Sequence, residues 1–141
     1  MPARKASAEW NGDLAHGTGT VSTESGAVGG AYSSASRFES GGGTNPEELV
    51  GAAHAACFSM AFAHGLANAG YTPDSVRTEA RVHLEKGEGG FAVTEIHLDC
   101  SARVPTIDEA TFQEQAAAAK LGCPISKALS AIDIHLDARL I

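Results

Sequence analysis

The sequence predicts an α+β fold in which an antiparallel β-sheet packs on a central Ala-rich helix and a second helix. Residues 75–86 and 91–104 alternate between apolar and polar side chains, as strands with one buried face do. Residues 46–69 instead place apolar side chains three and four positions apart, which is typical of a helix. The 141 residues fit a single domain, so we expect one domain spanning residues 1–141.

The N-terminal part is predicted to contain little regular structure. Residues 8–23 are expected to form a short β region, because Trp10 is followed by several Thr and Val residues. Residues 24–43 are rich in Gly, Ser and Ala and end in three consecutive glycines, which predicts a mobile loop. The basic residue Arg37 lies on this predicted loop.

The central helix has a clear predicted start and end. Asn45 is a suitable N-cap, Pro46 suits the first helical position, and Glu48 occupies the third position of a capping box. Gly70 is expected to end the helix after about residue 69. Its many alanines predict a thin, largely buried helix, whose expected core face comprises Leu49, Ala52, Ala53, Ala56, Met60, Ala63, Leu66 and Ala67.

The C-terminal half is predicted to build the sheet and a second helix. Residues 86–90 are expected to form the turn of a hairpin between the two alternating segments. A helix should begin at Thr106 or Asp108 and end near Gly122, followed by a short helix over residues 124–130. Residues 132–140 alternate again and predict the last strand of the antiparallel sheet.

Composition excludes several classes of function. The net charge of −7 and the pI near 5.2 argue against a nucleic-acid surface and against a polybasic membrane anchor. No apolar run approaches the roughly 20 residues of a membrane span, and residues 1–10 lack the apolar region of a signal peptide. We therefore expect a cytoplasmic protein. In a reducing compartment its three cysteines should be free, catalytic or metal-binding.

Two cysteines are candidates for thiol chemistry. Cys57 lies among apolar neighbours in the central helix, which should raise its pKa. Cys123 directly precedes Pro124, so N–H groups of the short helix are expected to point at its sulfur. Local electrostatics therefore rank Cys123 as the more reactive thiol, although both residues could equally be small buried hydrophobes. Cys100 belongs to the apolar face of a strand and is expected to be inert.

The sequence offers little support for a metal or cofactor. His54 and Cys57 are three positions apart on the helix and could join Cys123 in a metal site, but the sequence supplies no further ligand. The six histidines are scattered and form no HxH or HExxH pattern. We therefore expect no cofactor and no metal, and we expect His54 to pack against neighbouring backbone.

Long motifs of the chain resemble one known family. Residues 44–60, TNPEELVGAAHAACFSM, resemble the central-helix signature of the OsmC/Ohr family (osmotically inducible protein C / organic hydroperoxide resistance protein). Residues 122–129, GCPISKAL, resemble its second-cysteine motif, and residues 20–26 and 36–39 resemble the OsmC branch. The resemblance covers almost the whole chain in the expected order.

The resemblance implies a thiol-dependent peroxidase that acts on organic hydroperoxides in oxidative and osmotic stress defence. It makes Cys57 the peroxidatic cysteine and Cys123 the resolving cysteine. The two form a disulfide during turnover, and an external dithiol reduces it. A dithiol of the lipoyl type is one candidate reductant. The resemblance makes Arg37 the activating cation and Glu47 the carboxylate that holds it, and so overrules the local ranking of the thiols. The alternatives are a redox-sensing or ligand-binding stress protein of the same fold without turnover, and a metal-binding stress protein.

The spacing of Glu47 and Cys57 bears on how such a site is built. Ten residues of one straight helix span about 15 Å along its axis, which is too far for one Glu–Arg pair to bridge easily. Either Arg37 reaches across on an extended loop, or Arg37 and Glu47 come from a second subunit. The family resemblance implies intertwined homodimers, which favours the second arrangement. We therefore expect a composite site across a dimer interface.

Overall fold

The computed structural model describes all residues 1–141 and contains two compact units, Met1–Leu49 and Val50–Ile141. Each unit is described by itself. The prediction of a single domain over 1–141 therefore stays a prediction. The helices and strands of both units give the α+β class that the sequence predicts.

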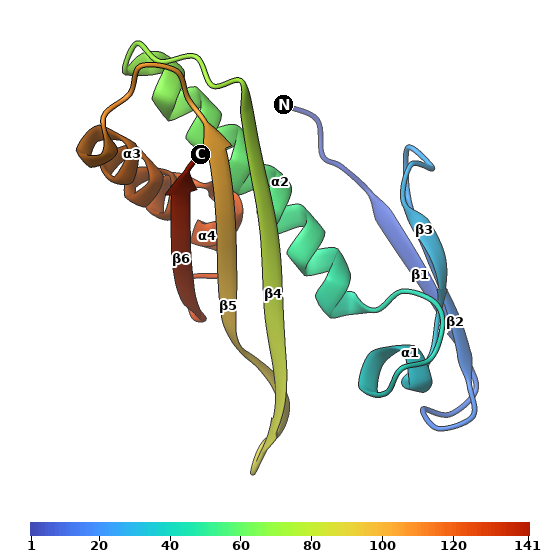
Figure 1. Cartoon of the computed structure of the whole chain (residues 1–141). Helices are drawn as coiled ribbons and strands as arrows, with labels where there is room; N and C mark the ends of the chain where they lie inside the picture. The colour runs from blue at the N-terminus through green and yellow to red at the C-terminus, as the bar shows by residue number, and fades with distance from the viewer. The chain divides into compact units, whose positions relative to one another are not determined.

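The first unit is a small antiparallel sheet followed by a short helix (Figure 1). Its strands β1 (Ala6–Asn11), β2 (Thr18–Thr23) and β3 (Gly29–Tyr32) pair in that order, and α1 (Ser34–Phe38) follows. The prediction of a loop over residues 24–43 is therefore wrong, since this segment contains β3 and α1. Glycine suits the strand because a Cβ at Gly29 would lie only 2.7 Å from the carbonyl oxygen of Val21.

Helix α2 (Pro46–Asn68) begins where the sequence predicts. The Glu48 amide donates to the Asn45 side chain at 2.8 Å, so Asn45 is the N-cap. The carboxylate of Glu48 accepts instead from the Thr44 hydroxyl at 3.1 Å. Gly70 follows the helix with a φ of 95°, a conformation in which glycine is favoured as a stop.

The predicted core face of α2 is largely wrong. Of the predicted residues only Leu66 is buried; the other buried residues are Gly51, His54, Phe58 and Phe62, whereas Met60 is 75% exposed. The helix is apolar on all sides, so spacing alone allowed more than one face, and the bulky aromatic side chains determine which face is buried. Gly51 faces the sheet, since a Cβ there would be in ordinary van der Waals contact with Val82, at 3.4 Å. The exposed apolar face comprises Ala52, Ala53, Ala56, Met60 and Ala67.

The length and composition of α2 contradict one expectation from the sequence. Its 23 residues include a window of mean hydropathy 1.4, so it is long and apolar enough to cross a membrane. The expectation that no run approaches this length is therefore wrong. Length and composition do not by themselves identify a membrane span, because core helices of soluble proteins share them.

The second unit contains a three-stranded sheet in the order β4–β5–β6, with strands β4 (Ser75–Gly87), β5 (Gly90–Arg103) and β6 (Asp133–Leu140). β4 and β5 form the predicted antiparallel hairpin. β6 pairs with β5 in parallel, so the sheet is mixed and the prediction of a purely antiparallel sheet is wrong. The reason is the long crossover between them, which contains α3 (Glu109–Gly122) and α4 (Pro124–Ala128) and returns the chain to the same end of the sheet (Figure 1).

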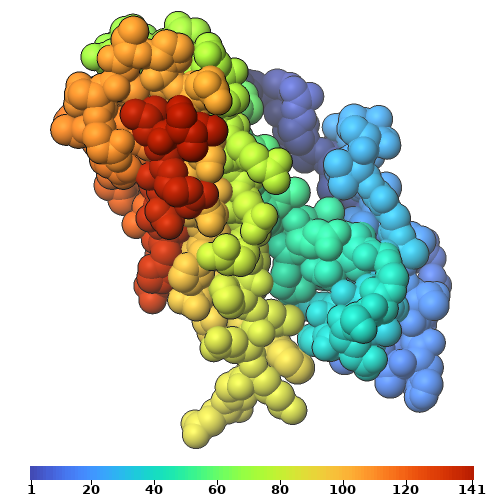
Figure 2. All heavy atoms as spheres, in the orientation of Figure 1, coloured from blue at the N-terminus to red at the C-terminus, as the bar shows by residue number.

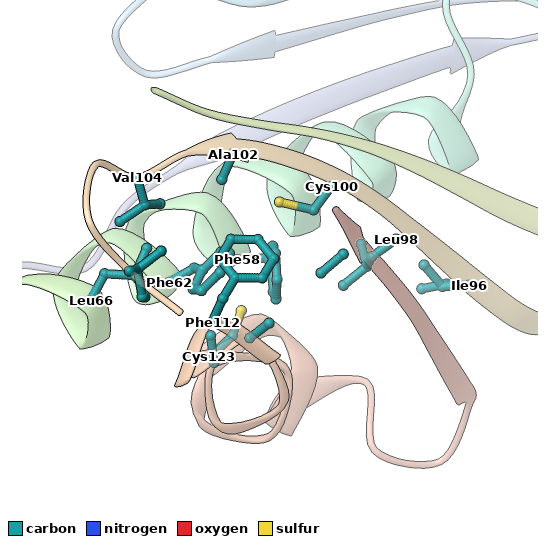
Figure 3. Packing of buried hydrophobic residues seen from close by; sticks show 14 residues of the cluster. Phe58, Phe62, Leu66, Ile96, Leu98, Cys100, Ala102, Val104, Phe112 and Cys123 are labelled. Carbon is teal, nitrogen blue, oxygen red and sulfur yellow. The ribbon is translucent and has the colours of Figure 1, made fainter. Parts of the chain in front are cut away.

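The core of this unit lies between the sheet and its helices (Figure 3). Phe58 and Phe62 of α2 form an aromatic chain with Phe112 of α3, with ring centroids 5.7 and 5.3 Å apart. Cys100 is fully buried in this core, and burial raises the pKa of its thiol. The side chains on the other face of the sheet are mostly polar. The atoms of β4, β5 and β6 lie side by side on the face of the molecule seen in Figure 2.

Candidate functional site

Two of the predicted site residues, Cys57 and Cys123, meet in the second unit. Cys57 lies on α2 and is half-buried, whereas Cys123 links α3 to α4 and is fully buried. Their side chains are hydrogen-bonded to each other, and both residues are free thiols. Residues 66 positions apart in the sequence are thus close enough for thiol–disulfide chemistry once Cys57 is oxidised.

The surroundings of the two sulfurs differ. Burial raises the pKa of Cys57, and its hydrogen bond to Cys123 raises it further. Burial also acts to raise the pKa of Cys123, but hydrogen bonds from Cys57, Ser126 and the Ile125 amide outweigh it, so this pKa lies below its ordinary value. These directions agree with the local ranking made from the sequence, in which the start of α4 favours a thiolate at Cys123.

A buried histidine supports the segment next to Cys123. His54 of α2 and Ser126 of α4 are hydrogen-bonded, with 2.8 Å between Nε2 and Oγ, and both side chains are buried. Burial lowers the pKa of His54, and its Nδ1 has no hydrogen-bond partner. Because Ser126 also bonds Cys123, a chain of contacts joins His54 to the sulfur. From the sequence, His54 is considered as a metal ligand and then expected to pack against backbone, and its partner Ser126 is missed.

The other two predicted residues, Arg37 and Glu47, form an ion pair in the first unit. Nη2 of Arg37 donates to Glu47 Oε1 at 2.7 Å, and its Nε lies 3.2 Å from both carboxylate oxygens. Such a bidentate pair fixes the plane of the guanidinium. The Ser36 hydroxyl donates to the Thr44 carbonyl at 2.7 Å, which ties α1 to the segment that precedes α2.

A cavity of about 400 Å³ opens beside Arg37 in the first unit. Its walls combine the guanidinium-bearing residue with apolar side chains, namely Trp10, Leu14, Tyr32 and Phe38. The rings of Trp10 and Tyr32 are 5.4 Å apart and pack over Gly19, where a Cβ would lie 2.5 Å from Tyr32. A largely apolar cavity next to one cation suits a small molecule with an alkyl tail and a polar end.

The structure therefore brings the four predicted residues together as two pairs, one in each unit. It also gathers residues that sequence reasoning left scattered: His83, Glu95, His97 and His135 share the polar face of the second sheet. Each occupies a polar position in the alternating pattern of its strand. That pattern was visible in the sequence, but their proximity depends on strand order and register.

The chain matches a family model and is similar in sequence to known proteins. Residues 39–137 match the family model described as OsmC-like protein, a range that includes Glu47, Cys57 and Cys123 and begins two positions after Arg37. The chain is 51% identical over 138 residues to peroxiredoxin OsmC of Escherichia coli (strain K12), covering 97% of this chain and 96% of that protein.

Organic hydroperoxide resistance protein OhrB of Bacillus subtilis (strain 168) is also similar in sequence. It is 37% identical over 98 residues, which cover 67% of this chain and 69% of OhrB. The crystal structure of OhrB of Bacillus subtilis superposes with a TM-score of 0.72 at 29% identity, covering 96% of this chain and 98% of OhrB.

Proposed function

The chain belongs to the OsmC-like protein family, and from this premise we propose that it is a thiol-dependent peroxidase that reduces organic hydroperoxides to alcohols in oxidative and osmotic stress defence. The observation that carries the proposal is the hydrogen-bonded pair of free thiols, Cys57 and Cys123. The names of the relatives, peroxiredoxin and organic hydroperoxide resistance protein, support the same chemistry.

The reaction has three balanced steps. The Cys57 thiolate attacks one peroxide oxygen, the O–O bond breaks, and the alkoxide leaves and takes up a proton to become the alcohol. Cys57 is thereby oxidised to a sulfenic acid. The Cys123 thiol then attacks the sulfenic sulfur, which releases water and forms the Cys57–Cys123 disulfide. An external dithiol, of the lipoyl type and in the cytoplasm, reduces this disulfide and is itself oxidised.

Arg37 supplies the charge that this reaction needs. A cation near Cys57 favours the thiolate, which burial otherwise disfavours, and stabilises the negative charge that grows on the leaving oxygen. Glu47 holds the guanidinium through its bidentate contact. The apolar cavity beside Arg37 accommodates the alkyl part of the substrate, which favours organic hydroperoxides over hydrogen peroxide.

We place Arg37 and Glu47 of one subunit beside Cys57 of a second subunit in a homodimer. Glu47 and Cys57 lie ten residues apart on α2, about 15 Å of helical rise, which disfavours a site built from one chain. The exposed apolar face of α2 offers an interface, because alanines let two helices approach closely. Reduction of the peroxide by Cys57 then requires the homodimer.

The test is turnover of a bulky alkyl hydroperoxide with a dithiol reductant. Cys57→Ser should lose all turnover, and Cys123→Ser should consume about one equivalent of peroxide per chain and then stop. Cys100→Ala is the matched control, because this third thiol is buried and neither Cys57 nor Cys123 is among the groups that shift its pKa. Multiple turnover by Cys57→Ser would refute the proposal, and single turnover by the wild type would instead support the redox sensor.

Mixed dimers test the composite arrangement. Dimers of Arg37→Ala chains alone and of Cys57→Ser chains alone are expected to be inactive, but one of the two composite sites of a mixed dimer has all four residues intact. After co-refolding, each mixed dimer should therefore have one working site, which is half the number in a wild-type dimer. Mixing that restores no activity, although mass spectrometry shows exchanged dimers, would contradict the composite site.

A further inference from the structure

The polar face of the second sheet gathers three imidazoles and one carboxylate, here called the histidine cluster: His83, Glu95, His97 and His135. Each strand contributes to it. His83 on β4 lies opposite Glu95 on β5, and His97 on β5 lies opposite His135 on β6. Glu95 and His97 are two positions apart on one strand and so share a face. None of these residues takes part in the proposed peroxidase chemistry.

The distances within the histidine cluster fit ligands of one ion better than direct hydrogen bonds. Glu95 Oε2 lies 3.4 Å from His97 Nε2 and 3.3 Å from His135 Nε2. Hydrogen bonds of this type are usually about 2.7–3.2 Å long. Ligands at about 2.0–2.1 Å from a tetrahedral zinc ion are about 3.3–3.4 Å from each other. These two distances therefore match the ligand-to-ligand spacing of such a tetrahedron.

The ring orientations agree with these distances. His97 and His135 are stacked, with centroids 4.6 Å apart and planes 23° apart, so both rings direct Nε2 toward the same carboxylate oxygen. His83 meets His97 edge-on at 5.2 Å. The ligand atoms of His83, Glu95 and His97 all lie within 4.8 Å of one another. These three residues can therefore each offer one ligand atom to a single ion.

We propose that the histidine cluster binds a divalent ion of the zinc class, with Glu95, His97 and His135 or His83 as ligands. Imidazole nitrogens with a single carboxylate favour Zn²⁺, Cu²⁺ or Ni²⁺ over Mg²⁺ and Ca²⁺, which prefer oxygen ligands. The side chains of His97 and His135 are 34% and 52% exposed, so an ion reaches them from solvent. Bound there, the ion links β5 to one neighbouring strand, to β4 through His83 or to β6 through His135.

The charges around the histidine cluster permit a cation. Arg81 of β4 is paired with His97, so its positive charge would repel a cation bound at the histidine cluster. Its guanidinium is 3.9 Å from Glu79 and 3.8 Å from Asp99, so these carboxylates offset its charge. On β6, Asp133 lies opposite Glu95 and adds a further carboxylate to this end of the sheet.

The experiment is a calorimetric titration of the full-length protein with Zn²⁺ alone. A Cys57→Ser/Cys123→Ser background removes the two thiols that would bind zinc elsewhere, and makes the result independent of peroxidase activity. We expect one equivalent of Zn²⁺ per chain. His97→Gln should weaken this binding about tenfold or more, because His97 contacts every other part of the histidine cluster. Co²⁺ should give the intense visible absorption of a tetrahedral site.

The matched control is His64→Gln in the same background. His64 is an exposed histidine of α2 that is hydrogen-bonded to Asn68. Its substitution therefore removes one imidazole and leaves the histidine cluster unchanged. Zinc binding should be unchanged in this variant, and circular dichroism verifies that both variants are folded. Absence of stoichiometric binding, or equal weakening by His64→Gln and His97→Gln, would overturn the proposal.

Discussion

The thiols of the second unit and the ion pair of the first unit are stabilised in different ways. Cys57 and Cys123 are held by packing and by hydrogen bonds, and no cation contributes to lowering either thiol pKa. Arg37 and Glu47 are held by a bidentate contact between opposite charges beside an apolar cavity. In the proposed reaction, the second unit supplies the sulfur, and the first unit supplies the positive charge and the substrate cavity.

Removal of the charge should produce the largest effect. Arg37→Ala is expected to lower kcat/KM for an alkyl hydroperoxide about 10²–10³-fold, the usual cost of losing a group that stabilises a developing oxyanion. Arg37→Lys should recover only part of this loss, because lysine keeps the charge without the bidentate fork. Arg77→Ala on the polar sheet face is the control and should retain activity. Equal activity of both alanine variants would show that the sulfur works without Arg37.

Removal of the group that holds the charge should have a smaller effect. Glu47→Gln keeps the size of the side chain but loses the charge-assisted contact with Arg37, so we expect a loss of about tenfold in kcat/KM. Glu48→Gln is a matched control one position away, since Glu48 contacts Thr44 rather than Arg37. If the two variants lose activity equally, the loss reflects the start of α2 rather than the orientation of Arg37.

Ser126→Ala tests the hydrogen bonds on the thiol side. It removes the partner of buried His54 and a donor to Cys123, so the free energy of unfolding should fall by about 1–3 kcal/mol. The pKa of Cys123 should rise, which iodoacetamide labelling against pH can measure in a Cys57→Ser background. Ser130→Ala, at an exposed position just beyond α4, should change neither quantity. An unchanged Cys123 pKa in Ser126→Ala would remove Ser126 from the description of the site.

The smallest effect concerns pH and His54. Burial lowers the pKa of His54 in the folded state below its usual 6.5, so the unfolded chain takes up the proton first. The contribution of neutral His54 to stability is therefore complete above about pH 6.5 and is lost as the pH falls below it, by at most about 1.4 kcal/mol per pH unit. Urea denaturation at several pH values measures this slope. His54→Gln should reduce it, and an unchanged slope would assign it to other groups.

Sequence patterns predicted the elements best where a local signal fixes them. Asn45 and Pro46 mark the start of α2, Asp108 is the N-cap of α3 as one of the two predicted starts, and the hairpin strands alternate cleanly. The patterns failed where tertiary contacts decide. Alternation in β6 gives its buried face but not its direction, and the alanines of α2 do not reveal that Phe58 and Phe62 face the core.

The site was predictable only in part for a similar reason. The motifs around Cys57 and Cys123 identified the two thiols through a family resemblance, whereas local electrostatics ranked them in the opposite order. The hydrogen bond between His54 and Ser126, which leads on to Cys123, joins residues 72 positions apart. No local pattern in the sequence indicates such a contact. The histidine cluster likewise depends on the order and register of three strands.

The parallel pairing of β6 has a consequence for the order of folding. The β4–β5 hairpin needs only a short turn and can form early, whereas β6 can pair with β5 only after the whole crossover from Val104 to Ile132 has closed. Cys123 lies on that crossover. We therefore expect its position relative to Cys57 to become fixed after the hairpin has formed.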